Sequence, residues 1–329
     1  MSSRRAFLAF ASAGPGVTLC VMPWAAAAQA GGPAVARVAV LTPGTRVWED
    51  FVRALRELGY VEGRNLVLVF RHGSYDFQRL RELAQELVAD KPDVIVAEST
   101  PAALAAKAVA GATPIVIVNV SDPQGVGLVE SLARPGGNIT GLTDHGVEIS
   151  TKSVQLLREI VPKATRFGVL MADNPLHATQ LREIEAAAAQ AGVSVVPVKA
   201  VREADLESAF SSLVARGADA LIVLAGVHDG STERNARLTG LAARAKLPAI
   251  YELQYMPAVG GLMSFGPDIP DSRKVAAAYV ARILRGARTS ELPVQRPAKF
   301  RLVINARTAR ALGLAIPQSL LIQAAEVIE

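Results

Sequence analysis

The chain has 329 residues and one cysteine; half of its residues are apolar, a fifth are charged, and its formal net charge is +5. This length suggests two domains, each large enough to bury a core, and the composition excludes a disordered or fibrous chain. The lone cysteine excludes a disulfide framework and a multi-cysteine metal site, and the mild charge, without a concentrated basic stripe, gives no support for nucleic-acid binding.

Residues 1–30 have the features of an export signal. Arg4 and Arg5 precede an apolar stretch, Ala6–Ala28, and the sequence Ala28-Gln29-Ala30 has the small-x-small pattern that signal peptidase recognises. Glycine and proline residues interrupt the stretch, which disfavours the alternative of a transmembrane helix. We therefore expect a periplasmic protein whose signal peptide is cleaved near Ala30.

The export route is indicated by the run Ser3–Leu8, which resembles the bacterial twin-arginine signal. A lipoprotein signal is disfavoured because Leu19 precedes Cys20 where such signals have a small residue. Cleavage would remove the cysteine and two arginines, leaving 33 basic against 30 acidic residues, or +3. The mature protein is expected to be soluble, monomeric and free of disulfides.

After the signal, short β-branched runs alternate with helical patterns, which is typical of parallel α/β units. The first half predicts strands Arg37–Leu41, Asn65–Phe70, Asp93–Ala97 and Pro114–Val118, and helices Val47–Leu58, Phe77–Ala89 and Pro101–Ala110. The second half predicts strands Arg166–Met171, Val193–Val198, Asp219–Leu224 and Leu247–Tyr251, and helices Ala178–Gln190, Ala204–Ala215, Glu233–Ala245 and Ser272–Arg285.

Matching phrases occur in the same order in the two halves. The run Lys91–Val96 parallels Gly217–Ile222, and Ala112–Val116 parallels Lys246–Ile250. The pattern predicts an α/β protein of two similar, doubly wound parallel-sheet lobes with a cleft between them, because the period is far too long for a solenoid. We expect lobe 1 over residues 34–145 and lobe 2 over 146–267, with 268–329 returning across the hinge to complete the lobes.

Candidate ligand-binding residues follow the strands, since open parallel sheets bind ligands beyond the carboxyl ends of their strands. In Ser99-Thr100-Pro101, a cap residue and a helix-starting proline leave backbone N–H groups free to bind a carboxylate. A plain helix cap is the alternative, and it applies equally to Asp122 before Pro123. The candidates in the first half are Thr42, Trp48, Ser99, Thr100, Asn119 and Asp122.

The second half offers polar and aromatic candidates at equivalent positions: Asn174, Gly226, His228, Asp229 and Tyr251. Trp48 could stack on a ligand or pack in the core, and together with Tyr251 it permits an aromatic ligand. These side chains are of the types that bind a small carboxylate-bearing solute.

No catalytic motif accompanies these residues. The sequence lacks the G-x-S-x-G, P-loop and H-E-x-x-H patterns, and Gly125-Val126-Gly127 lacks the third glycine of a dinucleotide-binding turn. The histidines have no metal-ligand spacing, and His177 and His228 are not expected to be catalytic. We therefore expect no enzymatic activity, no metal and no cofactor.

Several phrases together resemble the ABC-transporter substrate-binding protein family that has tryptophan- and tyrosine-binding members. They span nearly all of the chain after the signal and occur at Leu55–Gly63, Ser131–Gly141, Gly260–Gly266, Phe300–Asn305 and Ile316–Leu321. The resemblance implies a type I periplasmic-binding fold, in which two lobes joined by three crossing segments close on a ligand.

The resemblance also implies roles for some of these residues and a partner. The turn Ser99-Thr100 would bind the ligand carboxylate, with Asn119 and Asp122 on the same lobe, and Asn174 and residues 226–229 would line the other. The partner would be the membrane permease of an ABC importer. Two alternatives remain: a co-receptor that senses the ligand for a signalling protein, and an exported enzyme on the same fold.

Overall fold

The computed structural model describes residues 35–44, 48–73, 77–144, 146–174, 176–227 and 232–329. The expected export signal therefore lies outside the described residues. Within these ranges, no helix is both long enough and apolar enough to cross a bilayer. The described chain forms two α/β lobes, each built on its own sheet.

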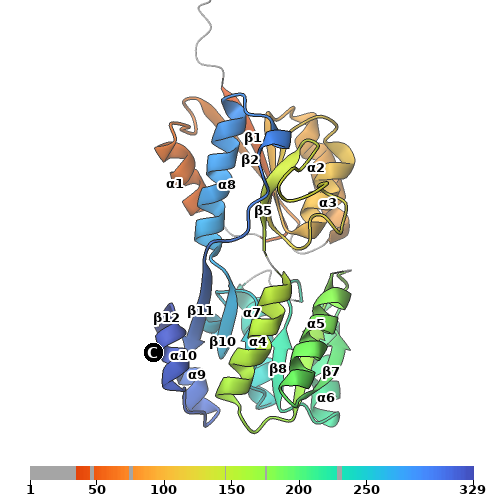
Figure 1. Ribbon diagram of the computed structural model, residues 1–329, viewed down its shortest axis with the longest axis vertical. Helices are drawn as coiled ribbons and strands as arrows, with labels where there is room; N and C mark the ends of the chain where they lie inside the picture. Colours follow the sequence, from red (N-terminus) through yellow and green to blue (C-terminus); the bar gives the residue numbers. More distant parts are fainter. Residues whose placement is uncertain (1–34, 45–47, 74–76, 145, 175, 228–231) are drawn as a thin grey trace, which may run out of the picture. The chain divides into compact units, whose positions relative to one another are not determined.

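The first lobe has a five-stranded parallel sheet in the order β2-β1-β3-β4-β5. Its strands are β1 (Ala36–Thr42), β2 (Leu66–His72), β3 (Val94–Glu98), β4 (Ile115–Val120) and β5 (Ile139–Thr143). The central strands are continuous apolar runs because both faces of the sheet are covered. Helices α1 (Glu49–Glu57) and α8 (Ile269–Leu284) pack side by side on one face, and α2 (Phe77–Ala89) and α3 (Thr100–Val109) cover the other (Figure 1).

The second lobe has a seven-stranded sheet in the order β12-β11-β10-β9-β8-β6-β7. Its strands are β6 (Arg166–Met171), β7 (Ser194–Lys199), β8 (Ala220–Val223), β9 (Ala249–Tyr251), β10 (Met263–Pro267), β11 (Phe300–Asn305) and β12 (Glu326–Ile328). All neighbours are parallel except β10 and β11, which pair antiparallel because the chain reaches β11 from the first lobe.

Helices cover both faces of this second sheet as well (Figure 1). One core includes residues of α4 (Gly146–Ile160), α5 (His177–Gln190), α9 (Ala306–Ala311) and α10 (Gln318–Gln323). The opposite core includes residues of α6 (Leu206–Ala215) and α7 (Thr232–Arg244). The fold class predicted from the sequence, two doubly wound parallel-sheet lobes, is confirmed.

The C-terminal region contributes to both lobes, a point that the sequence left open. Helix α8 packs on the first sheet through Tyr279 and Val280, whereas β11, α9, α10 and β12 belong to the second lobe. The chain therefore passes between the lobes after β5, after β10 and before β11. These crossings bring residues distant in sequence to the same ends of the sheets.

Candidate functional site

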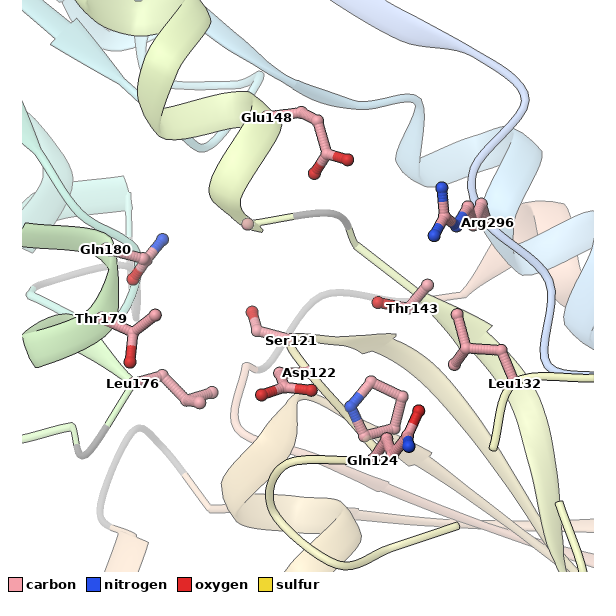
Figure 2. Close-up of a pocket in the computed structure, with 12 residues that line it drawn as sticks. Ser121, Asp122, Gln124, Leu132, Thr143, Glu148, Leu176, Thr179, Gln180 and Arg296 are labelled. Carbon is pink, nitrogen blue, oxygen red and sulfur yellow. The ribbon is translucent and has the colours of Figure 1, made fainter. Parts of the chain in front are cut away.

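A pocket of about 440 Å³ lies beyond the ends of β4 and β5, beside the first turns of α4 and α5. Figure 2 shows Leu176, Thr179 and Gln180 on one side of it, facing Ser121 and Asp122 on the other. The lining residues are Ser121, Asp122, Pro123, Gln124, Leu132, Thr143, Gly146, Glu148, Leu176, Thr179, Gln180 and Arg296. Its volume suits a small molecule, and both lobes supply its wall.

Asp122 is the predicted site residue that appears in this lining. Its Oδ1 accepts a hydrogen bond from the backbone N–H of Gly125 at 2.8 Å. A Cβ at Gly125 would lie 1.9 Å from Asp122 Oδ2, so this turn requires glycine. The side chain is exposed and faces the pocket (Figure 2). The carboxylate thus caps a local turn and also contributes to the pocket wall.

Strained backbone marks the same edge of the first sheet. Ser99, Asn119 and Asp122 have positive φ angles of 82°, 52° and 42°, which side-chain-bearing residues rarely adopt. Ser99 and Asp122 follow the ends of β3 and β4, and Asn119 is the penultimate residue of β4, where the sequence predicted ligand contacts. Such strain costs stability and clusters at functional sites, so it favours a binding role for this edge.

The helix start at Ser99 and Thr100 differs from a plain side-chain cap. Ser99 is the N-cap residue of α3, yet its hydroxyl makes no cap hydrogen bond and is buried without a partner among the described residues. Thr100 Oγ1 instead accepts a hydrogen bond from the backbone N–H of Ser121 at 3.2 Å. The Oδ1 atom of Asn119 is also buried and without a described partner. Neither Ser99 nor Thr100 lines the 440 Å³ pocket, but both lie one strand away from it.

Trp48 and Thr42 lie in a buried cluster of the first lobe. Trp48 is fully buried, and the guanidinium carbon of Arg273 lies 4.4 Å from its ring centroid. Arg273 pairs with Glu98 at 3.1 Å, and the Thr42 hydroxyl donates to the other Glu98 oxygen at 2.7 Å. The sequence left two roles open for Trp48, and in the structure its side chain packs in the core of the first lobe.

Asn174 and His177 organise the start of α5. Asn174 Oδ1 accepts a hydrogen bond from the backbone N–H of Leu176, and the Asn174 carbonyl accepts one from the N–H of His177, each at 3.0 Å. Both ring nitrogens of buried His177 contact backbone groups of Ala172 and Ala225, and burial lowers its pKa. Asn174 lines a separate pocket of about 360 Å³ with Met171 and Lys199.

The remaining second-lobe candidates lie elsewhere. Tyr251 is buried in the core, and its hydroxyl has no hydrogen-bond partner among the described residues. It lines a narrow cavity together with Gly226 and Glu252. His228 and Asp229 lie outside the described residues, so their predicted ligand contacts stay predictions.

Carboxylates gather around the main pocket. Asp144 accepts hydrogen bonds from the Ser121 hydroxyl at 2.6 Å and from the backbone N–H of Gly146 at 3.0 Å. Glu252 accepts hydrogen bonds from Gln180 Nε2 at 2.9 Å and from the N–H of Ala225 at 2.8 Å. Burial, with a contribution from the charge of Asp144, raises the pKa of Glu252 to about 8. At neutral pH Glu252 is therefore largely protonated.

Sequence reasoning missed most of the lining residues. Ser121 lies between the predicted site residues Asn119 and Asp122, so its position in the sequence could have indicated it. Thr179, Gln180 and Glu148 lie in the first turns of helices, and Arg296 lies in a crossing segment, where no motif marks them. Their proximity is a product of the three chain crossings.

Two similar parallel-sheet lobes that both contribute to one pocket of small-molecule size define the class of two-lobed solute-binding proteins. The model of the ABC transporter substrate-binding protein family matches residues 43–328, so the chain belongs to this family. Proteins of this family are extracytoplasmic and bind substrates without catalysing a reaction, so the predicted family and the predicted absence of enzymatic activity are confirmed.

Individual relatives have similar lengths and folds. A tyrosine-binding protein of Clostridioides difficile is 29% identical over 268 residues, which cover 81% of this chain and 76% of the relative. A conserved domain protein from Vibrio cholerae has a TM-score of 0.81 and 30% identity, covering 89% of this chain and 99% of that one. An ABC domain from Streptococcus pneumoniae in complex with L-Trp has a TM-score of 0.80 and 25% identity, covering 90% and 100%.

Proposed function

We propose that this protein captures a small carboxylate-bearing solute, an amino acid with an aromatic side chain, and delivers it to the membrane permease of an ABC importer. The observation that carries the proposal is the 440 Å³ pocket, which both lobes line with polar side chains. The names of two relatives, a tyrosine-binding protein and a domain in complex with L-Trp, support the amino-acid class.

The proposed ligand contacts come from both lobes. Asp122 and Ser121 would bind from the first lobe, with Ser99, Thr100 and Asn119 supporting the same edge, and Gln180 and Thr179 would bind from the second. A ligand that contacts both lobes stabilises the conformation in which those contacts coexist. Closure would then present to the permease a surface that the ligand-free protein lacks.

The proposed location is the periplasm. The twin-arginine-like signal over residues 1–30 would direct export, with cleavage near Ala30, and the mature protein would act as a monomer. Binding requires no cofactor, because hydrogen bonds and shape complementarity suffice for capture of a small solute. Transport energy would come from separate ATPase subunits.

Thermal unfolding with a panel of amino acids, aromatic acids, other carboxylates and sugars tests the proposal. A ligand at about 100 times its dissociation constant adds about 2.7 kcal/mol, which raises the unfolding midpoint by several degrees. A shift confined to aromatic amino acids is expected. If sugars alone shift the midpoint, the assigned class of solute is wrong. Mass spectrometry of the denatured protein checks for a ligand retained from expression.

A further inference from the structure

We infer that Arg296 is the residue of this pocket that binds the carboxylate of the ligand and thereby selects acids over their neutral analogues. The inference rests on the proposed function and adds a determinant of specificity to it. Three of the twelve lining residues carry charged side chains: Asp122, Glu148 and Arg296. Arg296 is the cation of the set, and Figure 2 shows its guanidinium directed toward the pocket with Glu148 facing it.

The backbone at Arg296 is fixed although it lies in a crossing segment. The N–H of Gln295 donates to the carbonyl of Gly141 at 2.8 Å, and the N–H of Thr143 donates to the carbonyl of Gln295 at 3.0 Å. Gln295 thus forms a single parallel β-bridge with Leu142 of β5. Pro297 follows and restricts the next backbone angle. The side chain therefore starts from a defined point at the pocket wall.

The guanidinium is available for a ligand. Arg296 is exposed and makes no hydrogen bond or ion pair with another residue in the described part of the chain. Arg273 of α8, by contrast, is paired with Glu98. A guanidinium presents a planar fork of donors that matches the two oxygens of a carboxylate, so an available arginine directed into a pocket suits an acid.

The acidic residues determine how such a ligand lies. Asp122 and Glu148 disfavour an anion beside them and favour an ammonium group. A zwitterion with its carboxylate at Arg296 can direct its ammonium group toward Asp122 or Glu148, so that each charge of the ligand faces an opposite charge. The start of α3 is the competing carboxylate site, but Ser99 and Thr100 do not line this pocket and Thr100 Oγ1 already accepts from Ser121.

Calorimetric titration of the full chain with L-tyrosine, L-tryptophan and their C-terminal amides tests the inference. The wild type should bind each acid more tightly than its amide. Arg296→Gln should weaken binding of the acids by about tenfold to a hundredfold, as expected for loss of a charge-assisted bond, and leave the amides unchanged. The affinity of Arg296→Lys for the acids should lie between those of the wild type and Arg296→Gln, because lysine keeps the positive charge but lacks the planar pair of donors.

Arg307→Gln is the matched control, since Arg307 is exposed on α9 and does not line the pocket. It should keep the wild-type preference for acids. Equal affinity of the wild type for acid and amide, or an unchanged preference in Arg296→Gln, would overturn the inference while leaving capture intact. If a Ser99→Ala/Thr100→Ala variant alone loses the preference, the carboxylate binds at α3 instead. Absence of binding for all four compounds would contradict the proposed function itself.

Discussion

The hydroxyl oxygen of Thr100 accepts a hydrogen bond from the backbone N–H of Ser121 at 3.2 Å and so joins the start of α3 to the end of β4. Ser121 in turn donates through its own hydroxyl to Asp144, in the segment between β5 and α4. Three consecutive strand ends are thereby connected by side chains. The neighbouring Ser99 hydroxyl makes no such bond with a described residue, although it is equally buried.

This difference predicts that two adjacent substitutions affect stability to different extents. Thr100→Val removes the acceptor and leaves a partly buried N–H unpaired, so it should lower the free energy of unfolding by about 1–3 kcal/mol. Ser99→Ala removes a hydroxyl that has no partner among the described residues, so its free energy of unfolding should stay within about 0.5 kcal/mol of the wild-type value. Urea unfolding of both variants provides the comparison.

Measuring ligand binding by variants of Ser99 and Thr100 distinguishes a role in binding from a role as the cap of α3. Ser99→Ala should weaken capture of the ligand identified by thermal unfolding without changing the preference for acids, because Ser99 supports the edge of the site and does not line the pocket. The pair Ser99→Ala/Thr100→Ala should lose more binding than stability. Parallel losses of binding and stability would reduce this turn to a cap for α3.

Glu252 should make stability depend on pH. Its pKa is raised to about 8 in the folded protein, mainly by burial, so the folded state retains a proton that the unfolded state releases above about pH 4.5. The unfolded state then binds fewer protons, and stability should fall as pH rises from about 5 through 8, by on the order of 1–3 kcal/mol. Unfolding free energies measured at intervals across this range check the slope.

Glu252→Gln is the control for that slope. Glutamine is neutral and can still accept the hydrogen bond from Gln180 or from the N–H of Ala225. The variant should therefore lose much of the decline between pH 5 and pH 8 and be the more stable protein at pH 8. A decline as steep as that of the wild type would assign the effect to another group.

Replacing one member of the ion pair between Glu98 and Arg273 should lower the free energy of unfolding. Both side chains are largely buried, and Arg273 also stacks on Trp48. Glu98→Gln leaves the guanidinium without its counter-charge and should destabilise the protein by about 3 kcal/mol. The double variant Glu98→Gln/Arg273→Met should recover part of that loss, as chemical denaturation of the single and double variants would show. A double variant no more stable than Glu98→Gln would exclude an uncompensated charge as the cause.

The export signal that the sequence predicts can be tested independently of the fold. If residues 1–30 direct twin-arginine export, replacing Arg4 and Arg5 with lysines should retain the protein inside the cell. Fractionation followed by immunoblotting measures this directly, with the native signal as the reference. Normal secretion of the variant would favour the general secretory route.

Elements with strong periodicity could be predicted from the sequence. Buried strands such as β3 and β4 are continuous β-branched runs, and α2 has a regular apolar face, so local patterns were sufficient. Helix α4 was not predicted, since its first half is rich in β-branched and small polar residues that favour helix only weakly. Its helical state depends on packing against the second sheet, through residues such as Leu156 and Leu157.

For this protein the sequence by itself determined the two-lobed α/β class, the family resemblance and the strand ends at which a ligand site belongs. Parallel strands must end at a common edge, and for that reason Ser99, Asn119 and Asp122 could be placed together without coordinates. Only the tertiary structure decided which neighbours complete the pocket and that Trp48 packs in the core. Gln180 and Arg296 reach the pocket through chain crossings, and side-chain proximity across such crossings depends on packing between segments far apart in sequence.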